Sequence, residues 1–131
     1  MGMFGALDAA STGVALGRTW MDAISDNVAN INTVRPGGQA PFRAKEVVAQ
    51  SLPGTSGVTV AAIEEKSGTP QVVYDPQNPL ADANGNVTRP VVDMSEEMTN
   101  MLVATRLYQA NLNVMSQAKE VYQAALQIGK S

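Results

Sequence analysis

The sequence of 131 residues contains no cysteine and no histidine. Without cysteine the chain has no disulfide framework and no thiolate zinc site, and without histidine it lacks the usual general base and the commonest metal ligand. The acidic pairs Glu64–Glu65 and Glu96–Glu97 are sequence neighbours, and adjacent side chains on a helix point in different directions. We therefore expect no enzyme, no catalytic residue, no cofactor and no metal.

Positive charge and long apolar runs are also scarce. The chain has 9 basic and 12 acidic side chains and a net charge of −3, with the basic residues scattered, which argues against binding a nucleic-acid backbone. No apolar run approaches the roughly 18 to 20 residues of a membrane span. The start, MGMFGALDAAST, has neither the basic region nor the continuous apolar core of a signal peptide. We expect no nucleic-acid partner, no direct membrane insertion and no cleaved signal peptide.

Proline is missing from both ends of the sequence. All seven prolines and six of the eleven glycines lie between residues 34 and 92, a density that excludes long helices and central strands. Short apolar runs at 46–49, 58–63, 71–74 and 87–92 predict a few short strands, with Asn84-Gly85 as a hairpin turn. We therefore divide the chain into an N-terminal segment 1–33, a middle segment 34–92 and a C-terminal segment 93–131, which together form one structural unit.

The N-terminal segment has the periodicity of a helix. Its apolar and small residues follow steps of three and four: Leu7, Ala10, Val14, Gly17, Met21, Ile24, Val28 and Ile31. We expect the helix to begin near residue 3 or 4 and to end between residues 30 and 33, where asparagines gather before a proline. Gly13 and Gly17 each weaken this helix by about 1 kcal/mol relative to alanine, but they would let a neighbouring helix approach closely.

The C-terminal segment predicts a longer helix. Asp93 is placed to cap it, with Glu96 bonding back in a capping box, and Gly129 ends it. About 35 residues at 1.5 Å per residue give a length of roughly 50 Å. One stripe alternates steps of four and three: Met94, Met98, Met101, Thr105, Tyr108, Leu112, Met115, Lys119, Tyr122 and Leu126. A second stripe is offset from it: Leu107, Ala110, Val114, Ala118, Val121, Ala125 and Ile128.

These stripes determine the expected architecture. A period of 3.5 residues keeps one narrow stripe against a partner helix, so we predict a mainly α fold, with two long terminal helices packing as a coiled-coil-like hairpin and a small loop-rich β insertion between them. A single partner helix covers only one stripe. Burying about six side chains of the second stripe at ~1.5 kcal/mol each gives about 9 kcal/mol, so we expect the helices to become fully ordered only beside neighbouring subunits.

Several short segments resemble a known family. The run Asn27-Val28-Ala29-Asn30-Ile31-Asn32-Thr33 is similar to the N-x-A-N-x-N-T signature of the axial proteins of the bacterial flagellum. The pattern of the proximal rod proteins of the basal body is matched at 74–79, Ala81-Asp82, Gly85, Pro90, Glu97-Met98, 106–111 and, after the signature, 42–47. The chain departs from that pattern at Asn86 and at Val91-Val92. The resemblance covers nearly the whole sequence.

The resemblance implies a structural subunit of the flagellar basal-body rod. Such a subunit polymerises through its terminal helices into a shaft that crosses the periplasm and transmits torque. The implied partners are other copies of the chain, other proximal and distal rod proteins, and the flagellar type III export apparatus. That apparatus would export the chain unfolded. The resemblance also implies that the asparagine-rich turn is a joint at the subunit contact.

The predicted subunit interface combines the two helices with the matched motifs. Its residues are Leu7, Val14, Met21, Ile24, Asn27, Val28, Asn30, Asn32, Thr33, Met98, Met101, Thr105, Arg106, Tyr108, Asn111, Leu112, Met115 and Tyr122. The stripes are equally typical of an intramolecular core, and the Asn cluster of a simple helix end. The alternative function is a soluble helical binding module or chaperone that does not polymerise.

Overall fold

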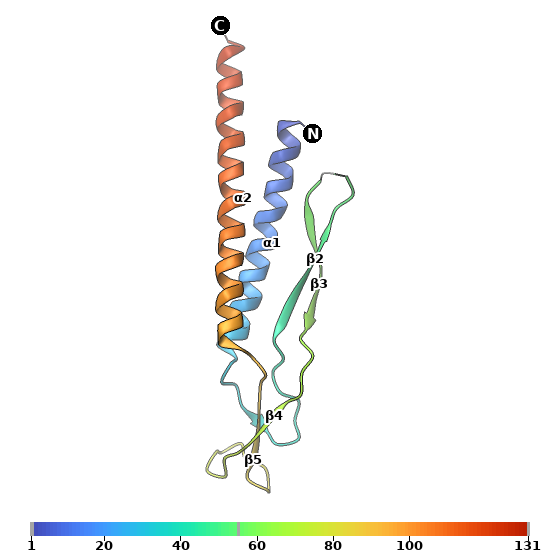
Figure 1. Ribbon diagram of the computed structural model, residues 1–131, viewed down its shortest axis with the longest axis vertical. Helices are drawn as coiled ribbons and strands as arrows, with labels where there is room; N and C mark the ends of the chain where they lie inside the picture. Colours follow the sequence, from blue (N-terminus) through green and yellow to red (C-terminus); the bar gives the residue numbers. More distant parts are fainter. Residues whose placement is uncertain (1, 55, 131) are drawn as a thin grey trace.

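The computed structural model describes residues 2–54 and 56–130, with a helix at each end of the chain and short strands between them (Figure 1). Helix α1 spans Met3–Ala29 and helix α2 spans Met94–Ile128. The strands are β1 (Arg35–Pro36), β2 (Lys45–Ser51), β3 (Val58–Glu65), β4 (Gln71–Tyr74) and β5 (Asn86–Arg89). Two helices with a small β region between them confirm the coarse fold prediction.

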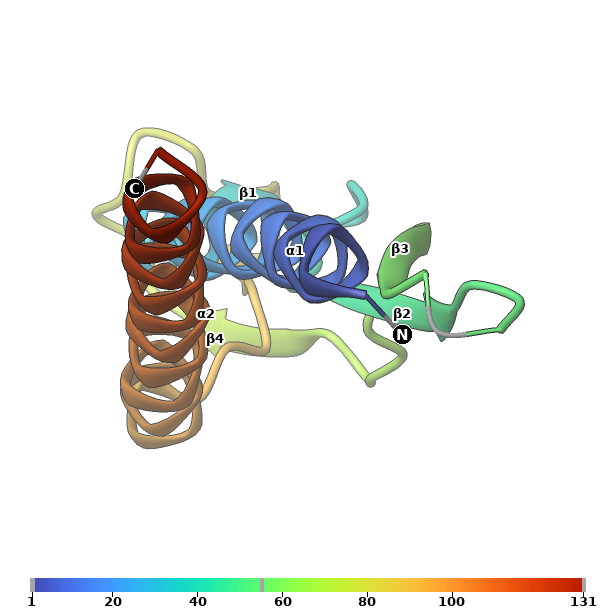
Figure 2. The same ribbon diagram turned by 90° about the horizontal axis from the view of Figure 1, so that it is seen from above.

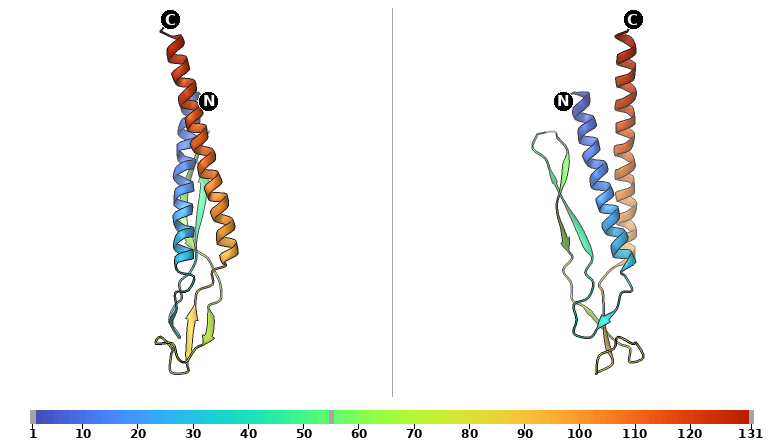
Figure 3. Two further views of the ribbon diagram at one scale, coloured as in Figure 1. Left: turned by 90° about the vertical axis from the view of Figure 1, so that its left-hand side faces the viewer. Right: turned by 180° about the vertical axis from the view of Figure 1, so that it is seen from behind.

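The elements form an elongated arrangement with α1 in the middle. The two helices lie side by side where α1 ends and α2 begins, and they diverge toward the end of the molecule that holds both termini (Figures 1 and 3). The β2–β3 hairpin stands on the other side of α1 (Figure 2). Among the described helices and strands, α2 packs only against α1, whereas α1 contacts α2, β2 and β3. Helix α2 is thus covered on one side only.

The end of α1 is fixed by the side chain of Asn30. Its Nδ2 donates to the carbonyl oxygen of Asp26 at 2.8 Å, and its Oδ1 accepts from the Thr33 hydroxyl at 3.1 Å. The first bond adds to the one that the Asp26 carbonyl oxygen accepts from the Asn30 N–H at 3.1 Å, and the second ties the side chain of Asn30 to that of Thr33 in the turn that follows. The predicted end of the first helix, in the asparagine-rich stretch, is confirmed.

The sequence predicts two features of the start of α2, the Asp93 cap and the return bond from Glu96, and the structure has the first of them. Asp93 caps the helix, because its Oδ1 accepts from the backbone N–H groups of Ser95 at 2.8 Å and Glu96 at 3.2 Å. The Glu96 side chain, however, forms an ion pair with Lys66 of the middle segment. The reciprocal half of the predicted capping box is therefore replaced by a contact from outside the helix.

The middle segment forms two small antiparallel sheets. Strand β2 pairs with β3 through a register shift between Val48 and Ala49, and the other sheet has the order β1-β5-β4. The sequence did not predict β1, whose Pro36 is tolerated because the strand lies at an edge. Strands β4 and β5 do pair, but residues 75–85 connect them, so the expected two-residue turn at Asn84-Gly85 is wrong. Only the glycine of that pair adopts a positive φ, at 76°.

The hydrophobic core is thin. The buried hydrophobic residues among those described are Ala10, Ala23, Ile24, Ala44, Val87 and Ala104, so most of them are alanines. The large apolar side chains of α2 are instead widely exposed, among them Met94, Met98, Leu102, Val103, Leu112, Val114, Val121, Tyr122 and Leu126. Contiguous exposed apolar surface is unusual for a monomeric soluble protein and marks an interaction surface. None of the described helices is apolar enough over a sufficient length to cross a membrane.

Candidate subunit interface

A buried asparagine joins three elements at the base of the helix pair. The side chain of Asn27, near the end of α1, is 1% exposed. Its Oδ1 accepts from the Lys45 N–H at 2.7 Å and its Nδ2 donates to the Lys45 carbonyl oxygen at 2.9 Å. The same Nδ2 donates to both carboxylate oxygens of Glu97 in α2 at 3.2 Å. One side chain therefore ties the end of α1 to the first residue of β2 and to the first turn of α2.

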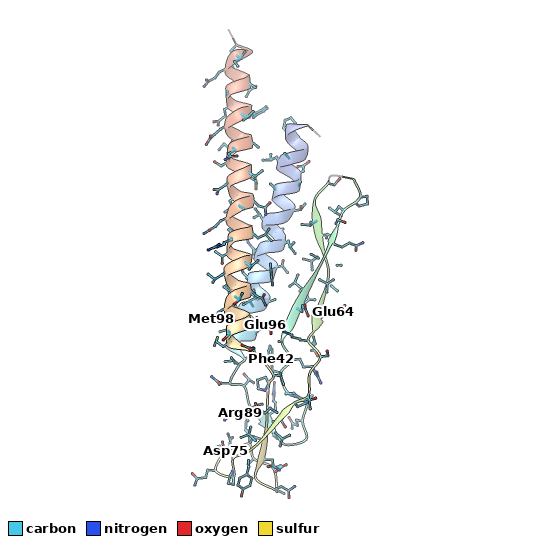
Figure 4. All side chains as sticks on the ribbon, in the orientation of Figure 1. Phe42, Glu64, Asp75, Arg89, Glu96 and Met98 are labelled. Carbon is cyan, nitrogen blue, oxygen red and sulfur yellow. The ribbon has the colours of Figure 1, made fainter. Side chains whose placement is uncertain are left out.

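Surface ion pairs reinforce this joint from outside. The Lys45 Nζ lies 2.5 Å from Oδ2 of Asp26, so both the backbone and the side chain of Lys45 are held by the end of α1. On the other side, Lys66 pairs with Glu96, whose position at the start of α2 is labelled in Figure 4. The hydrogen bond to the Glu96 carboxylate raises the pKa of Lys66. Exposed pairs of this kind contribute little to stability, so the joint depends mainly on Asn27.

Above the joint, glycines bring the helices together. A Cβ on Gly17 would lie 3.2 Å from the Tyr108 Cβ, and one on Gly13 would lie 2.6 Å from the Asn111 side chain. The Thr105 hydroxyl also donates to the Met21 sulfur at 3.7 Å. The close helix approach that the two glycines predicted is confirmed, and the neighbouring helix belongs to the same chain.

The side of α2 that faces α1 differs in part from the predicted stripe. Seven of its buried or half-buried positions alternate steps of four and three: Glu97, Met101, Ala104, Tyr108, Asn111, Met115 and Ala118. The predicted stripe contains every second one of these residues. Glu97 and Asn111 are polar, so a search for apolar periodicity does not find them. They fit in the helix contact because Glu97 bonds Asn27 and Asn111 packs beside Gly13. The sequence signal that could have revealed them is the spacing alone.

The predicted interface residues divide into three groups by exposure. Ile24 and Asn27 are buried within the chain. The half-buried residues are Leu7, Val14, Met21, Val28, Asn30, Thr33, Met101, Thr105, Tyr108, Asn111 and Met115. The exposed residues are Asn32, Met98, Arg106, Leu112 and Tyr122. Because the Asn27 amide is fully used inside the chain, it supports the joint from within, and the exposed group is the part that a neighbour can reach.

Two apolar surfaces of α2 are left open by α1, and Figure 4 shows side chains projecting along the whole length of this helix. On one side, at helical spacing, are Met94, Met98, Leu102 and Leu112, which we call the methionine flank. On the opposite side are Val103, Leu107, Ala110, Val114, Val121 and Ala125, which we call the outer ridge. Residues between them, such as Arg106 and Asn113, are polar. The outer ridge contains most of the second stripe predicted from the sequence.

Known proteins are similar in sequence to this chain over nearly its full length. The family model described as flagellar basal body rod FlgEFG protein C-terminal matches residues 83–128, which include all of α2. This match relates the α2 region to the class of flagellar basal-body rod proteins. The relatives are each named flagellar basal-body rod protein FlgC. The one from Salmonella typhimurium is 40% identical over 99% of this chain and 100% of its own length.

Two more distant organisms have relatives of the same kind. The FlgC protein of Bacillus subtilis is 34% identical over 99% of this chain and 100% of its own length. That of Borreliella burgdorferi is 32% identical over 98% of both chains. The chain belongs to the FlgC family of flagellar basal-body rod proteins. This is a family of rod structural proteins and not of enzymes.

Proposed function

We propose that this rod protein polymerises through α1 and α2, together with other copies and other rod proteins, into a shaft that crosses the periplasm and transmits torque. The observation that supports this proposal most strongly is the exposure of large apolar side chains along α2, on both sides of its contact with α1. Neighbouring subunits would bury those side chains. The helix pair would then act as a coiled-coil-like hairpin whose packing is completed by neighbours.

The three segments of the chain would have different functions in the rod. Segments 1–33 and 93–131 supply the helices that assemble, and segment 34–92 decorates or staggers the shaft. Torque requires resistance to twist, which helices packed on several sides provide because protein interiors are dense and little compressible. The thin core of the isolated subunit is compatible with passage of an unfolded chain through the flagellar type III export apparatus, the expected partner before assembly.

The direct contacts would involve the exposed part of the predicted interface. The side chains of Met98 and Leu112 are 61% and 39% exposed and lie on the methionine flank. Arg106 and Asn32 would add polar contacts at its margin, and the half-buried members of the set would hold the helices in position beneath it.

A charge on the methionine flank tests the proposal. Leu112→Asp places a carboxylate at a position that is exposed in the single subunit, so the variant should keep the helicity and thermal stability of the wild type. In a rod the carboxylate would be buried without a partner, which costs several kcal/mol. We expect export to continue while rod assembly and motility are lost, as measured by immunoblots of isolated basal bodies and by swimming assays.

The matched control is Asn113→Asp, one residue along α2 on its polar side, which should assemble and swim normally. Met101→Asp provides a second comparison, because Met101 faces α1, and this variant should lose helicity as well as motility. Normal motility in Leu112→Asp would refute the interface assignment. A loss of helicity in that variant would refute it too, since it would place Leu112 in the core of the subunit itself.

A further inference from the structure

A groove lies between α1 and the β2–β3 hairpin. It has a volume of about 330 Å³. Ala15 and Leu16 of α1 form one wall, and Leu52, Val58 and Val60 of the hairpin and its tip form the other. None of the described residues that line it is charged. Because α2 of the same chain contacts neither strand of the hairpin, the subunit cannot fill this groove with its own long helix.

Two of the three threonines that line the groove, Thr12 and Thr19, use their hydroxyl protons within the subunit. The Thr12 hydroxyl donates to the carbonyl oxygen of Ala9 at 2.7 Å and also accepts from the Val58 N–H at 3.0 Å. The Thr19 hydroxyl donates to the carbonyl oxygen of Ala15 at 3.1 Å. The third threonine, Thr59, is exposed on β3, and the other described lining residues are alanine, leucine and valine. The groove thus favours an apolar, uncharged partner.

Contacts at two levels hold the groove open. Toward the base, Asn27 fixes the first residue of β2 to α1, and further along the helix Thr12 fixes the first residue of β3. Gly57 permits the second contact, since a Cβ at that position would collide with the Thr12 hydroxyl. The hairpin is therefore anchored to α1 at the groove itself by Thr12 and again nearer the base by Asn27, so the space between it and α1 is preformed. A preformed site spares an occupant the cost of ordering it.

The outer ridge of α2 has the properties that such an occupant requires. Apart from Leu107 its members are alanines and valines, it carries no charge, and Val114 and Val121 are 43% and 60% exposed. These two valines are seven residues apart, a distance of about 10 Å along a helix. Thr12 and Thr19, which bound the α1 wall of the groove, are also seven residues apart. The ridge and the groove match in polarity and in length.

We propose that the groove between α1 and the β2–β3 hairpin receives the Val114–Val121 part of the outer ridge from a second copy of this chain. The inference deepens the proposed function and rests on it, because it names the two surfaces through which copies join. Since the two surfaces are different and lie on separate parts of the subunit, the contact is head-to-tail. Head-to-tail contacts that do not close into a ring generate helical filaments, which is the form of a shaft.

Disulfide crosslinking in basal bodies tests this contact, and the absence of native cysteine makes it specific. Cells would carry two differently tagged copies, one with Leu16→Cys and the other with Val114→Cys or Val121→Cys. After mild oxidation of isolated basal bodies, we expect at least one of the two pairs to give a product that carries both tags. Which pair does so depends on the orientation of the inserted helix. The control pairs Leu16→Cys with Leu112→Cys on the opposite side of α2, and we expect about ten-fold less product there because disulfides require close Cα atoms.

The possible outcomes separate the two proposals. If rods assemble normally and neither ridge cysteine links to Leu16→Cys above the control, the groove is not the partner of the ridge, although the proposed function stands. If the wild-type chain never enters rods, both proposals fail. If a Leu16→Cys copy is excluded from rods, Ala15→Cys in the same wall replaces it, with the same expected product and the same refuting result.

Discussion

At the scale of single residues, Asn27 makes the buried hydrogen bonds that hold α1, β2 and α2 together at the joint. Its amide pairs with both backbone groups of Lys45 in the manner of a neighbouring strand, and its remaining donor reaches Glu97. These partners are 18 and 70 residues away in the sequence. Since the side chains of Asn27 and Glu97 are both buried, water does not readily replace the bond between them, and a missing amide would leave the Glu97 carboxylate without this partner.

Replacement of Asn27 by alanine should therefore be costly. We expect Asn27→Ala to lower the free energy of unfolding by about 2 to 4 kcal/mol, because the Lys45 backbone and the Glu97 carboxylate lose hydrogen bonds in a buried setting. Urea denaturation followed by circular dichroism measures the change. Asn32→Ala is the matched control from the same motif, since Asn32 is exposed, and it should change stability by less than about 0.5 kcal/mol. Equal effects of the two substitutions would contradict this role of Asn27.

At the scale of elements, α1 is the helix on which the others assemble. It contacts α2 on one side and the hairpin on the other, and small residues on its surface make both approaches possible. Gly17 lets the Tyr108 backbone come close, and Gly57 of the hairpin tip does the same for Thr12. A helix with such glycines is weak by intrinsic propensity, so its stability comes from packing between elements.

A side chain at Gly17 should force the helices apart. We expect Gly17→Val to lower the free energy of unfolding by about 1 to 3 kcal/mol, as overpacking does elsewhere, although valine is a better helix former than glycine. Thermal denaturation checks the result. Arg18→Val, at the adjacent exposed position, introduces the same side chain outside the contact and should have a much smaller effect. If both variants melt alike, the close approach of α1 and α2 does not contribute to stability.

The elements also show which parts of the fold the sequence could predict. Both helices were predictable, because periodicity, the Asp93 cap and the asparagine-rich end are local signals. Strand β1 was not, since two residues give no period, and the long connection after Tyr74 depends on Asp82 bonding the backbone of Asn84 and Asn86. The helix contact was predictable only in part, because its polar members are acceptable only beside partners that are distant in the sequence.

The site was predictable to a similar degree. The second stripe of α2 already indicated an apolar surface that one partner helix leaves uncovered, and most of it lies on the outer ridge. The groove beside α1 could not be predicted, because it arises from the placement of the hairpin. That placement is fixed by two hydrogen-bonded contacts, at Asn27 and at Thr12, between residues far apart in the chain.

At the scale of the whole molecule, more large apolar side chains lie on the surface than in the core. The core is built largely from alanines, whereas methionines, leucines and valines of α2 face outward. Burying an exposed side chain of that size is worth about 1.5 to 3 kcal/mol, so assembly can supply more stabilisation than the fold of one subunit. A rod subunit organised in this way would gain its rigidity from its neighbours.

The central claim is that neighbouring subunits bury the exposed apolar sides of α2 in the rod. Cysteine accessibility measures this most directly, with Met98→Cys for the methionine flank and Val121→Cys for the outer ridge, each labelled by a maleimide reagent. Both cysteines should react readily in the isolated chain, slowly in intact basal bodies, and readily again after the basal bodies are denatured. Equal labelling rates in the isolated chain and in intact basal bodies would contradict the account.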